Sequence, residues 1–355
     1  MRSFNWWILG PALVLVGLSL VTLFSIAPDF LFQQILFLVA GIVFFFSLYQ
    51  TDYRIFKIFG GLFHLMAIAL LGALFLFAPR VRETVRWFDI GGFQIQPSEF
   101  AKPFLTLFFA SVLSSLREFS LKNLLFLSFL ISLPVSLVAK QPDLGTAFIL
   151  LSFWLVMILV AGFPLKILLL FLLVFSILLP QFWGFLKDYQ KMRILTFLNP
   201  NLDPLGAGYN VIQAQIAVGS GRIFGKGLGF GTQSHLKFLP EQHTDFIFAT
   251  LAEEAGFLGS VIVVGAFFVL IFQILATAQK ALDAFGCLLC VGVASQLLVQ
   301  VFVNIGMNIG LVPITGITLP LVSYGGSSLI STFISLGIVA SVAKREKPSA
   351  AVDIK

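Results

Sequence analysis

Residues 219–259 carry the side chains of this chain that are best suited to chemistry. Within an otherwise apolar sequence, the segment holds the carboxylates of Glu241, Asp245, Glu253 and Glu254. A charged side chain at membrane depth costs about 2.5–3.5 kcal/mol on the insertion scale. Acids gathered at the start of an apolar run therefore predict a functional site, and Asp245, which opens that run, is the candidate catalytic residue.

Polar motifs of the same kind stand at the starts of three other apolar runs. The four motifs are QPSE at 96–99 with Lys102 after it, QPDLGT at 141–146, PEQHTD at 240–245 and SYGGSS at 323–328. Free N–H groups at a helix start favour anions. Proline, serine and acids there are also ordinary caps, and Glu99 and Lys102 are spaced to neutralise each other. Four motifs on one side nevertheless predict a shared cavity.

The composition is that of a membrane protein. Of 355 residues, 59% are hydrophobic and 11% are charged, against about 25% charged residues in a soluble domain. A helix of about 20 apolar residues spans a bilayer, so we expect an all-α, polytopic single domain over residues 1–355 with about ten transmembrane helices. The expected spans are 7–26, 31–49, 55–77, 98–116, 122–139, 144–162, 164–186, 245–276, 285–309 and 320–343.

A long extracytoplasmic loop, at about 187–244, is expected between spans seven and eight. Span eight is too long for one perpendicular crossing. It is either an interfacial turn followed by a spanning helix or one tilted helix.

Lysine and arginine in short loops set the orientation of such a chain. With the N-terminus inside, the 22 basic residues divide evenly between the two sides of the membrane. Most of the outer ones fall in two long loops, however, and charges in long loops have little influence on orientation. We therefore place both termini in the cytoplasm and the polar motifs outside. Outer cations predict an anionic ligand such as phosphate or contacts with phospholipid headgroups.

Four long blocks resemble the SEDS family (shape, elongation, division and sporulation) and follow the order of that family. They are RWFDIGGFQIQPSEFAK at 86–102, KQPDLGTA at 140–147, the stretch from NPNLDPLGAGY to EEAGFLG at 199–259, and PITGITLPLVSYGGSSL at 313–329. The resemblance covers essentially the whole chain. It is nearer to the elongation branch than to the division branch.

The resemblance implies a peptidoglycan glycosyltransferase. Such an enzyme polymerises lipid II at the outer face of the bacterial cytoplasmic (inner) membrane, surrounded by membrane lipids, with a class B penicillin-binding protein and other elongation-complex proteins as partners. Nucleic acid is not an expected partner. The resemblance makes Asp245, in HTDF, the catalytic residue, and motif positions of the family fall on Trp87, Glu99, Lys102 and Asp143.

Further substrate-binding candidates come from the outer cations and the last motif. They are Lys140, Arg193, Arg222, Lys226 and Ser327. Glycosyl transfer needs a base for the acceptor hydroxyl and positive charge for the departing pyrophosphate. Asp245 is the candidate base, and His243 is the alternative. A divalent cation, Mg²⁺ or Mn²⁺, is a candidate cofactor that would bridge the phosphates, with no metal ligand assigned.

Two opposing effects act on Asp245 as a base. The start of a helix stabilises the charged carboxylate and weakens it as a base, whereas a surrounding of low dielectric constant raises its pKa. The sequence leaves the balance between them open.

Two other functions fit part of the sequence. A transporter that flips the lipid-linked precursor would also carry intramembrane acids, but its polar residues belong near the midplane and often in two repeats, and here they gather toward one face. A scaffold for a partner enzyme would leave the outer carboxylates no role beyond capping. A division-branch enzyme is the alternative within the family.

Overall fold

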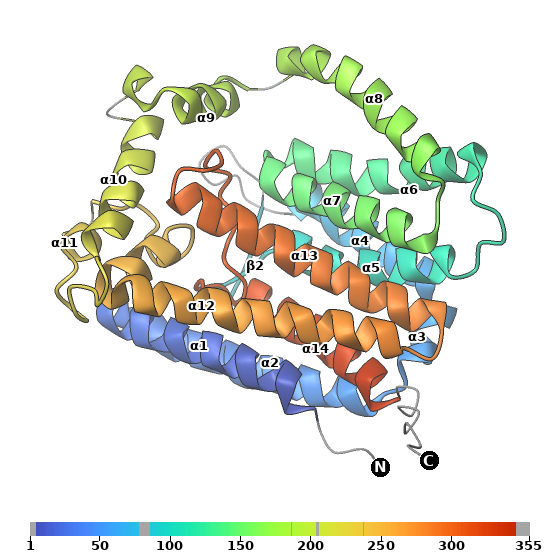
Figure 1. Cartoon of the computed structure of the whole chain (residues 1–355), viewed down its shortest axis with the longest axis horizontal. Helices are drawn as coiled ribbons and strands as arrows, with labels where there is room; N and C mark the ends of the chain where they lie inside the picture. The colour runs from blue at the N-terminus through green and yellow to red at the C-terminus, as the bar shows by residue number, and fades with distance from the viewer. Residues whose placement is uncertain (1–4, 78–85, 186, 204–205, 237, 346–355) are drawn as a thin grey trace, which may run out of the picture.

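The computed structural model describes residues 5–77, 86–185, 187–203, 206–236 and 238–345. Within these ranges the chain forms a bundle of long helices (Figure 1). Eight of the described helices are long and apolar enough to cross a membrane: α1 (Trp6–Ile26), α2 (Leu31–Gln50), α4 (Gly60–Phe77), α6 (Leu121–Lys140), α7 (Leu144–Ala161), α12 (Ile247–Lys280), α13 (Ala284–Asn308) and α14 (Gly326–Lys344). The all-α membrane-protein class is confirmed.

Two further helices stand where the remaining spans were expected. They are α5 (Pro97–Leu113) and α8 (Leu165–Phe182). α5 has 17 residues and carries Glu99 and Lys102 in its first half, while Figure 1 draws α8 arching over the bundle, away from α13. The count of ten spans therefore stays a prediction.

The segment expected as a long loop is largely helical in its described residues. It contains α9 (Asp188–Leu198), η3 (Pro200–Leu202), α10 (Ala207–Ser220) and α11 (Thr232–His235). The other short helices are η1 (Pro28–Phe30), α3 (Tyr53–Ile58) and η2 (Trp183–Phe185). α10 and α11 lie at one end of the bundle, whereas α1 begins and α14 ends at the other (Figure 1).

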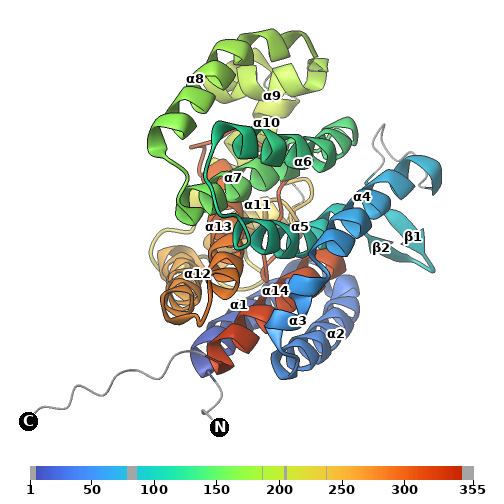
Figure 2. The same ribbon diagram turned by 90° about the vertical axis from the view of Figure 1, so that its right-hand side faces the viewer.

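α13 and α14 form the centre of the bundle. They are the two most buried of the eight candidate spans, with 78% and 89% of an 18-residue stretch of each inside the structure. α13 lies between α7 and α12 (Figure 2), and α14 packs along α2. Glycines allow this second contact, because a Cβ on Gly41 would lie 2.7 Å from the Phe333 ring and one on Gly337 would lie 2.8 Å from the Phe45 carbonyl oxygen. Small residues are a usual device of close helix packing in membranes.

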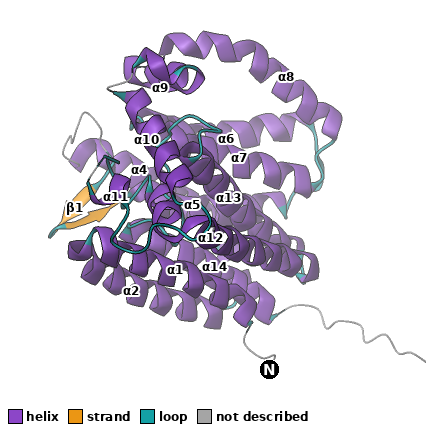
Figure 3. Cartoon of the chain, turned by 60° about the vertical axis from the view of Figure 1, so that its left-hand side comes forward, coloured by secondary structure: helices purple, strands orange, loops and turns teal. Residues whose placement is uncertain are grey.

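One hairpin is the described exception to the helical fold. β1 (Phe88–Ile90) pairs antiparallel with β2 (Phe93–Ile95) just before α5 (Figure 3). Gly91 and Gly92 form its turn, with φ values of 62° and 84°, which glycine adopts without steric cost. The hairpin ends directly before the QPSE motif and so positions the start of α5.

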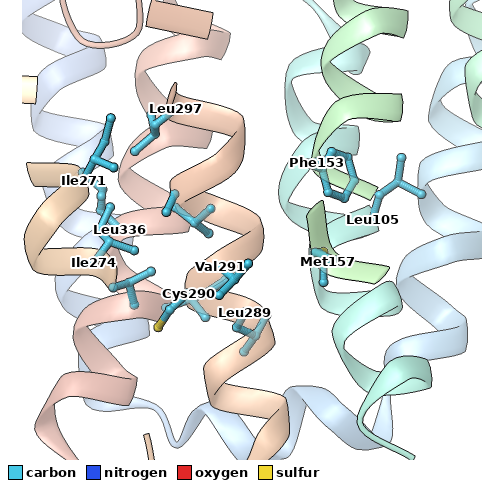
Figure 4. Packing of buried hydrophobic residues seen from close by; sticks show 14 of the residues in the cluster. Leu105, Phe153, Met157, Ile271, Ile274, Leu289, Cys290, Val291, Leu297 and Leu336 are labelled. Atoms are coloured by element: carbon cyan, nitrogen blue, oxygen red, sulfur yellow. The ribbon is translucent and has the colours of Figure 1, made fainter. Parts of the chain in front are cut away.

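Apolar side chains hold the remaining helices in place. Figure 4 shows Phe153 and Met157 of α7 beside Leu105 of α5, and all three are fully buried. Their packing fixes the two helices whose first turns carry polar motifs.

α12 is a short helix and a long one joined by a kink. Gly256 interrupts it with φ 68° and ψ −161°, a conformation that only glycine adopts readily. The part before the kink carries Glu253 and Glu254, and the part after it is apolar. Of the two arrangements considered for span eight, the structure has the turn followed by a spanning helix.

Candidate active site

The starts of α5, α7 and α14 meet around Gln96. Its backbone N–H donates to Oγ of Ser327 at 2.9 Å, and its side-chain amide donates to Oδ2 of Asp143 at 3.4 Å. Asp143 in turn caps α7, because it accepts from the backbone N–H of Thr146 at 3.2 Å and from the Thr146 hydroxyl at 2.9 Å. Three of the four polar motifs therefore converge, and both oxygens of the Asp143 carboxylate are engaged as a helix cap.

Arg86 brings a positive charge to the same place. Its Nε donates to the carbonyl oxygen of Gln141 at 3.1 Å, and its Nη2 donates to that of Pro142. Arg86 precedes the β1–β2 hairpin, so it ties the hairpin to the turn between α6 and α7. Trp87 follows it and is half-buried.

The fourth motif places Asp245 in the turn directly before α12, with its side chain partly exposed. A Cβ on Gly316 would lie 3.5 Å from Oδ2 of Asp245 and 4.0 Å from Nη1 of Arg193. The carboxylate and the guanidinium therefore face one small space that Gly316 leaves open. Gly316 also has φ 74°, where a side chain would be strained. No described residue donates a hydrogen bond to the Asp245 carboxylate or forms an ion pair with it.

The surroundings of Asp245 raise its pKa to about 6. Burial is the largest cause and the nearby charge of Glu241 is the second, while Arg193 and Arg86 oppose them and Asp143 adds a smaller upward effect. Burial and the two neighbouring carboxylates together thus outweigh the cations. A carboxylate with a pKa near 6 is mostly ionised at neutral pH and is a stronger base than an ordinary aspartate.

His243, the alternative base, is engaged in packing. Its ring stacks on Phe30 with centroids 4.9 Å apart and lies 5.8 Å from the Tyr324 ring. Burial lowers the pKa of His243, and the charge of Glu241 opposes that shift. The imidazole therefore packs the turn that carries Asp245 against its neighbours. Asp245 remains the candidate base.

Glu99 and Lys102 form a buried ion pair inside the bundle. Nζ of Lys102 donates to Oε2 of Glu99 at 2.7 Å, and Ser331 of α14 donates to the same oxygen at 3.5 Å. Their side chains are only 7% and 5% exposed, so the lysine is neutralised by its neighbour on α5. The capping and neutralising interpretation of this motif describes its geometry well.

The other predicted cations lie apart from Asp245 in the described contacts. Lys226 pairs with Glu253 at 2.8 Å. Arg222 is exposed at the end of α10, on the rim of a groove of about 650 Å³ formed with α12 and α13. Lys140 is exposed at the end of α6. Of the cations predicted to bind substrate, Arg193 alone is shown beside Asp245 among the described residues.

Two residues of the site were not predicted as such. Arg86 was not among the candidates, although it directly precedes Trp87 in the block at 86–102. Gly316 had no signal beyond its position in the PITGITLP block. Its contact with Asp245 joins residues 71 positions apart, which spacing along the chain does not reveal.

Comparison with known proteins agrees with this architecture. Residues 4–348 match the family described as cell cycle protein, which groups FtsW, RodA and SpoVE. The peptidoglycan glycosyltransferase MrdB of Escherichia coli K12 is 40% identical over 86% of this chain and 84% of its own length. The peptidoglycan glycosyltransferase RodA of Treponema pallidum is 34% identical over 97% of this chain and 98% of its own.

A solved structure shares the whole fold. It was described as showing structural coordination of polymerization and crosslinking by a peptidoglycan synthase complex, and one of its chains superposes with a TM-score of 0.84 and 32% identity, covering 97% of this chain and 99% of that one. The fold, the converging motifs and these relatives agree: the chain belongs to the FtsW/RodA/SpoVE family of cell cycle proteins, the SEDS family.

Proposed function

We propose that this chain is a peptidoglycan glycosyltransferase that polymerises lipid II, with Asp245 as its general base. One observation carries the proposal: the Asp245 carboxylate and the Arg193 guanidinium face the same space at Gly316. The carboxylate receives no hydrogen bond from the described residues. The relatives named above as peptidoglycan glycosyltransferases support the reaction class.

In the proposed step, Asp245 removes the proton from the 4-hydroxyl of the acceptor sugar. The hydroxyl oxygen forms a bond to the anomeric carbon of the donor, and the bond from that carbon to the pyrophosphate oxygen breaks. The polyprenyl pyrophosphate leaves with the bonding electrons, and the charge of Arg193, supplemented by Arg86, stabilises it. A positioned base contributes typically about 100- to 10,000-fold to such a step.

The charges of the site support Arg193 over the other predicted phosphate ligands. Lys102 and Lys226 are each held by a glutamate, whereas Arg193 has no carboxylate partner among the described ion pairs and stacks its guanidinium 5.8 Å from the Tyr189 ring centroid. We therefore assign the pyrophosphate to Arg193 first. Trp87, Asp143 and Ser327 would shape the wall of the site, and Lys140 and Arg222 would meet the lipid headgroup region.

A divalent cation stays a proposal. The described residues contain no group of three His, Cys, Asp or Glu side chains that could form a protein cage for a metal. Mg²⁺ usually arrives with substrate phosphates and takes only one or two carboxylates from the protein, so the pyrophosphate would supply most of its ligands and Asp245 would remain the base. The ion would neutralise pyrophosphate charge.

The location also belongs to the proposal. The chain is an integral membrane protein, and the polar motifs lie at the end of the bundle opposite the start of α1 and the end of α14. We place both termini in the cytoplasm, the site at the outer face of the bacterial inner membrane, and the enzyme in cell elongation beside a class B penicillin-binding protein and other elongation-complex proteins. The similar chain in a peptidoglycan synthase complex supports a crosslinking partner.

The experiment is polymerisation of fluorescent lipid II by purified Asp245→Asn, in complex with its transpeptidase. We expect a loss of about 1,000-fold, within the range for a general base. Asp188→Asn is the matched control, because Asp188 lies on α9 near the same end and its side chain is fully exposed. Polymer formation by Asp245→Asn at the rate of the control would refute the assignment.

The buried Glu99–Lys102 pair favours one second candidate, a lipid II flippase, since charge inside a bundle is typical of transporters. Liposomes loaded with fluorescent lipid II separate the two functions. Translocation without polymer would support the flippase, and polymer without translocation would support the transferase.

A further inference from the structure

Three consecutive carbonyl groups, those of His243, Thr244 and Asp245, accept hydrogen bonds from α13 and from the segment before α14. The carbonyl oxygen of His243 accepts from the backbone N–H of Tyr324 at 2.9 Å. That of Thr244 accepts from Oγ of Ser323 at 2.7 Å. That of Asp245 accepts from the side-chain amides of Asn304 and Asn308, at 3.1 Å each.

Asn304 and Asn308 are one helical turn apart on α13, and both are 0% exposed. Residues four apart lie on the same helix face, so two amides point at one carbonyl. Burying an amide is costly unless it is hydrogen-bonded, and a fully apolar α13 would pack without them. Their burial therefore calls for a reason other than packing.

The Asn304 amide connects the two sides of the candidate site. It donates to the carbonyl of Asp245 at 3.1 Å and to that of Ile317 at 2.7 Å. Ile317 follows Gly316, whose missing side chain leaves room for the Asp245 carboxylate. A single amide thus connects the turn that carries the carboxylate with the irregular segment at Gly316 and Ile317 that faces it.

Asn308 connects the same turn to α12. Its amide nitrogen donates to the Asp245 carbonyl, and its Oδ1 accepts from the backbone N–H of Ala249 at 3.3 Å, in the first turn of α12. The main chain of Asp245 is therefore held on both sides while its carboxylate receives no hydrogen bond from the described residues. This arrangement holds the main chain of Asp245 in place while the oxygens that would accept the proton receive no hydrogen bond from the described residues.

We propose that Asn304 and Asn308, with Ser323 beside them, are positioning residues for Asp245 in glycosyl transfer. The proposal rests on the proposed function, because it gives these residues the task of fixing the base. Misplacing a catalytic group by about 1 Å costs on the order of 100-fold in rate. Loss of the amides lets the turn shift while the phosphate-binding cations stay in place.

The test is steady-state polymerisation of lipid II by Asn304→Leu and Asn308→Leu, each purified with its transpeptidase and corrected for the folded fraction. Leucine keeps the size of the side chain and removes the donors. We expect kcat to fall about 10- to 100-fold with KM for lipid II changed less than about twofold. A purely structural role would lower the folded yield and leave kcat per folded molecule unchanged.

A milder variant keeps the test decisive if the leucine variants do not fold. Ser323→Ala removes one hydroxyl, and we expect a fall in kcat of about tenfold with KM unchanged. Ser341→Ala is the matched control, because Ser341 is equally buried, donates to the Thr51 carbonyl at 2.6 Å and lies at the opposite end of the bundle. It is expected to keep the wild-type kcat.

The outcomes separate this inference from the proposed function. If every folded variant keeps kcat, or if KM rises while kcat stays constant, the positioning role is overturned. If Asp245→Asn is inactive at the same time, the proposed function stands and this inference alone fails. If Asp245→Asn is fully active, the assignment of Asp245 as the base fails, and this inference fails with it.

Discussion

The carboxylates of Asp245 and Glu253 lie eight residues apart on the same stretch of chain, and their hydrogen bonding is opposite. The Asp245 carboxylate, before α12, receives no hydrogen bond from the described residues. The Glu253 carboxylate, in the first part of α12, has both oxygens occupied. Oε1 accepts from Lys226 at 2.8 Å and the Gln233 N–H at 2.9 Å, and Oε2 accepts from the Ser234 N–H at 3.0 Å and its hydroxyl at 2.7 Å.

Glu254 extends the hydrogen bonding of Glu253 to α1. Its Oε1 accepts from the Ser25 hydroxyl at 2.5 Å and from the Gly229 N–H at 3.1 Å, and it pairs with His235 at 2.9 Å. The two glutamates thereby fasten the glycine-rich loop 225–235 to α12 and α1. Gly225 is required there, since a Cβ would lie 2.0 Å from the Glu254 carbonyl oxygen.

The difference in hydrogen bonding distinguishes the proposed catalytic carboxylate from the two carboxylates that hold the loop. A carboxylate surrounded by donors is stabilised in its charged form and accepts a proton poorly. One that is partly buried and without donors has a raised pKa and is ready to accept one. Both regions carry acidic side chains within the same sequence block at 199–259, so the hydrogen-bond partners, and not the sequence, identify the base.

Removing the Glu253 charge gives the largest expected effect on stability. Glu253→Gln removes the charge that pairs with Lys226 and replaces one of the two acceptor oxygens by an NH2 group, and loss of one partner of a buried ion pair costs about 3–5 kcal/mol. We expect a lower thermal unfolding midpoint in detergent, with polymerisation per folded molecule unchanged. A Glu253→Gln variant as stable as the wild type would contradict the structural role assigned to the Glu253 carboxylate.

Asp245→Asn is expected to act in the opposite direction on stability. The pKa of Asp245 in the folded protein, about 6, lies above the ordinary aspartate value of 3.8, so the ionised group destabilises the fold by up to about 3 kcal/mol at pH 7. The stability that the protonated group contributes is complete below about pH 4 and lost as pH rises through about 6. Unfolding midpoints should therefore favour Asn at pH 7 and coincide with the wild type near pH 4. Equal midpoints at both pH values would contradict the raised pKa.

Arg193→Gln removes the cation opposite Asp245. Loss of one preorganised group that stabilises developing charge costs about 100-fold in kcat. The measurement is lipid II polymerisation, with Lys191→Gln as the control, because Lys191 lies on the same helix beside exposed Asp188. An equal loss in both variants would mean that α9 supplies charge without a specific site.

Glu241→Gln is expected to give the smallest effect. The charge of Glu241 raises the pKa of Asp245, so its removal should shift the acidic limb of the rate profile to lower pH, while the plateau rate stays close to that of the wild type. The profile of kcat between pH 4 and 8 measures it. A shift to higher pH would mean that Glu241 acts on a different group.

The sequence predicted much of this molecule because local signals were strong. Apolar runs of membrane length located the spanning helices, the charged start and Gly256 indicated the break in α12, and motif starts predicted that Gln96, Asp143 and Ser327 would meet. The segment expected as a loop at 187–244 is largely helical in its described residues. Its helices were not predicted because they are short and lie among glycines and prolines.

The pairing of charges was beyond the reach of sequence. Lys226 is neutralised by Glu253, 27 positions away, and Arg86 reaches backbone carbonyls 55 and 56 positions away. Asn304 and Asn308 read as polar interruptions of a span, since nothing along the chain shows that both point at one carbonyl. Such contacts exist only after the helices have packed.

The pH dependence of kcat for lipid II polymerisation, in the wild type and in Arg193→Gln, tests the central claim most directly. Asp245 acts as a base only when ionised, so the wild-type rate should rise through an inflection near pH 6 and then level off. Because Arg193 lowers the pKa of Asp245, its removal should move the inflection to higher pH. An inflection at the ordinary pKa of an aspartate, or one that does not move in Arg193→Gln, would contradict the account.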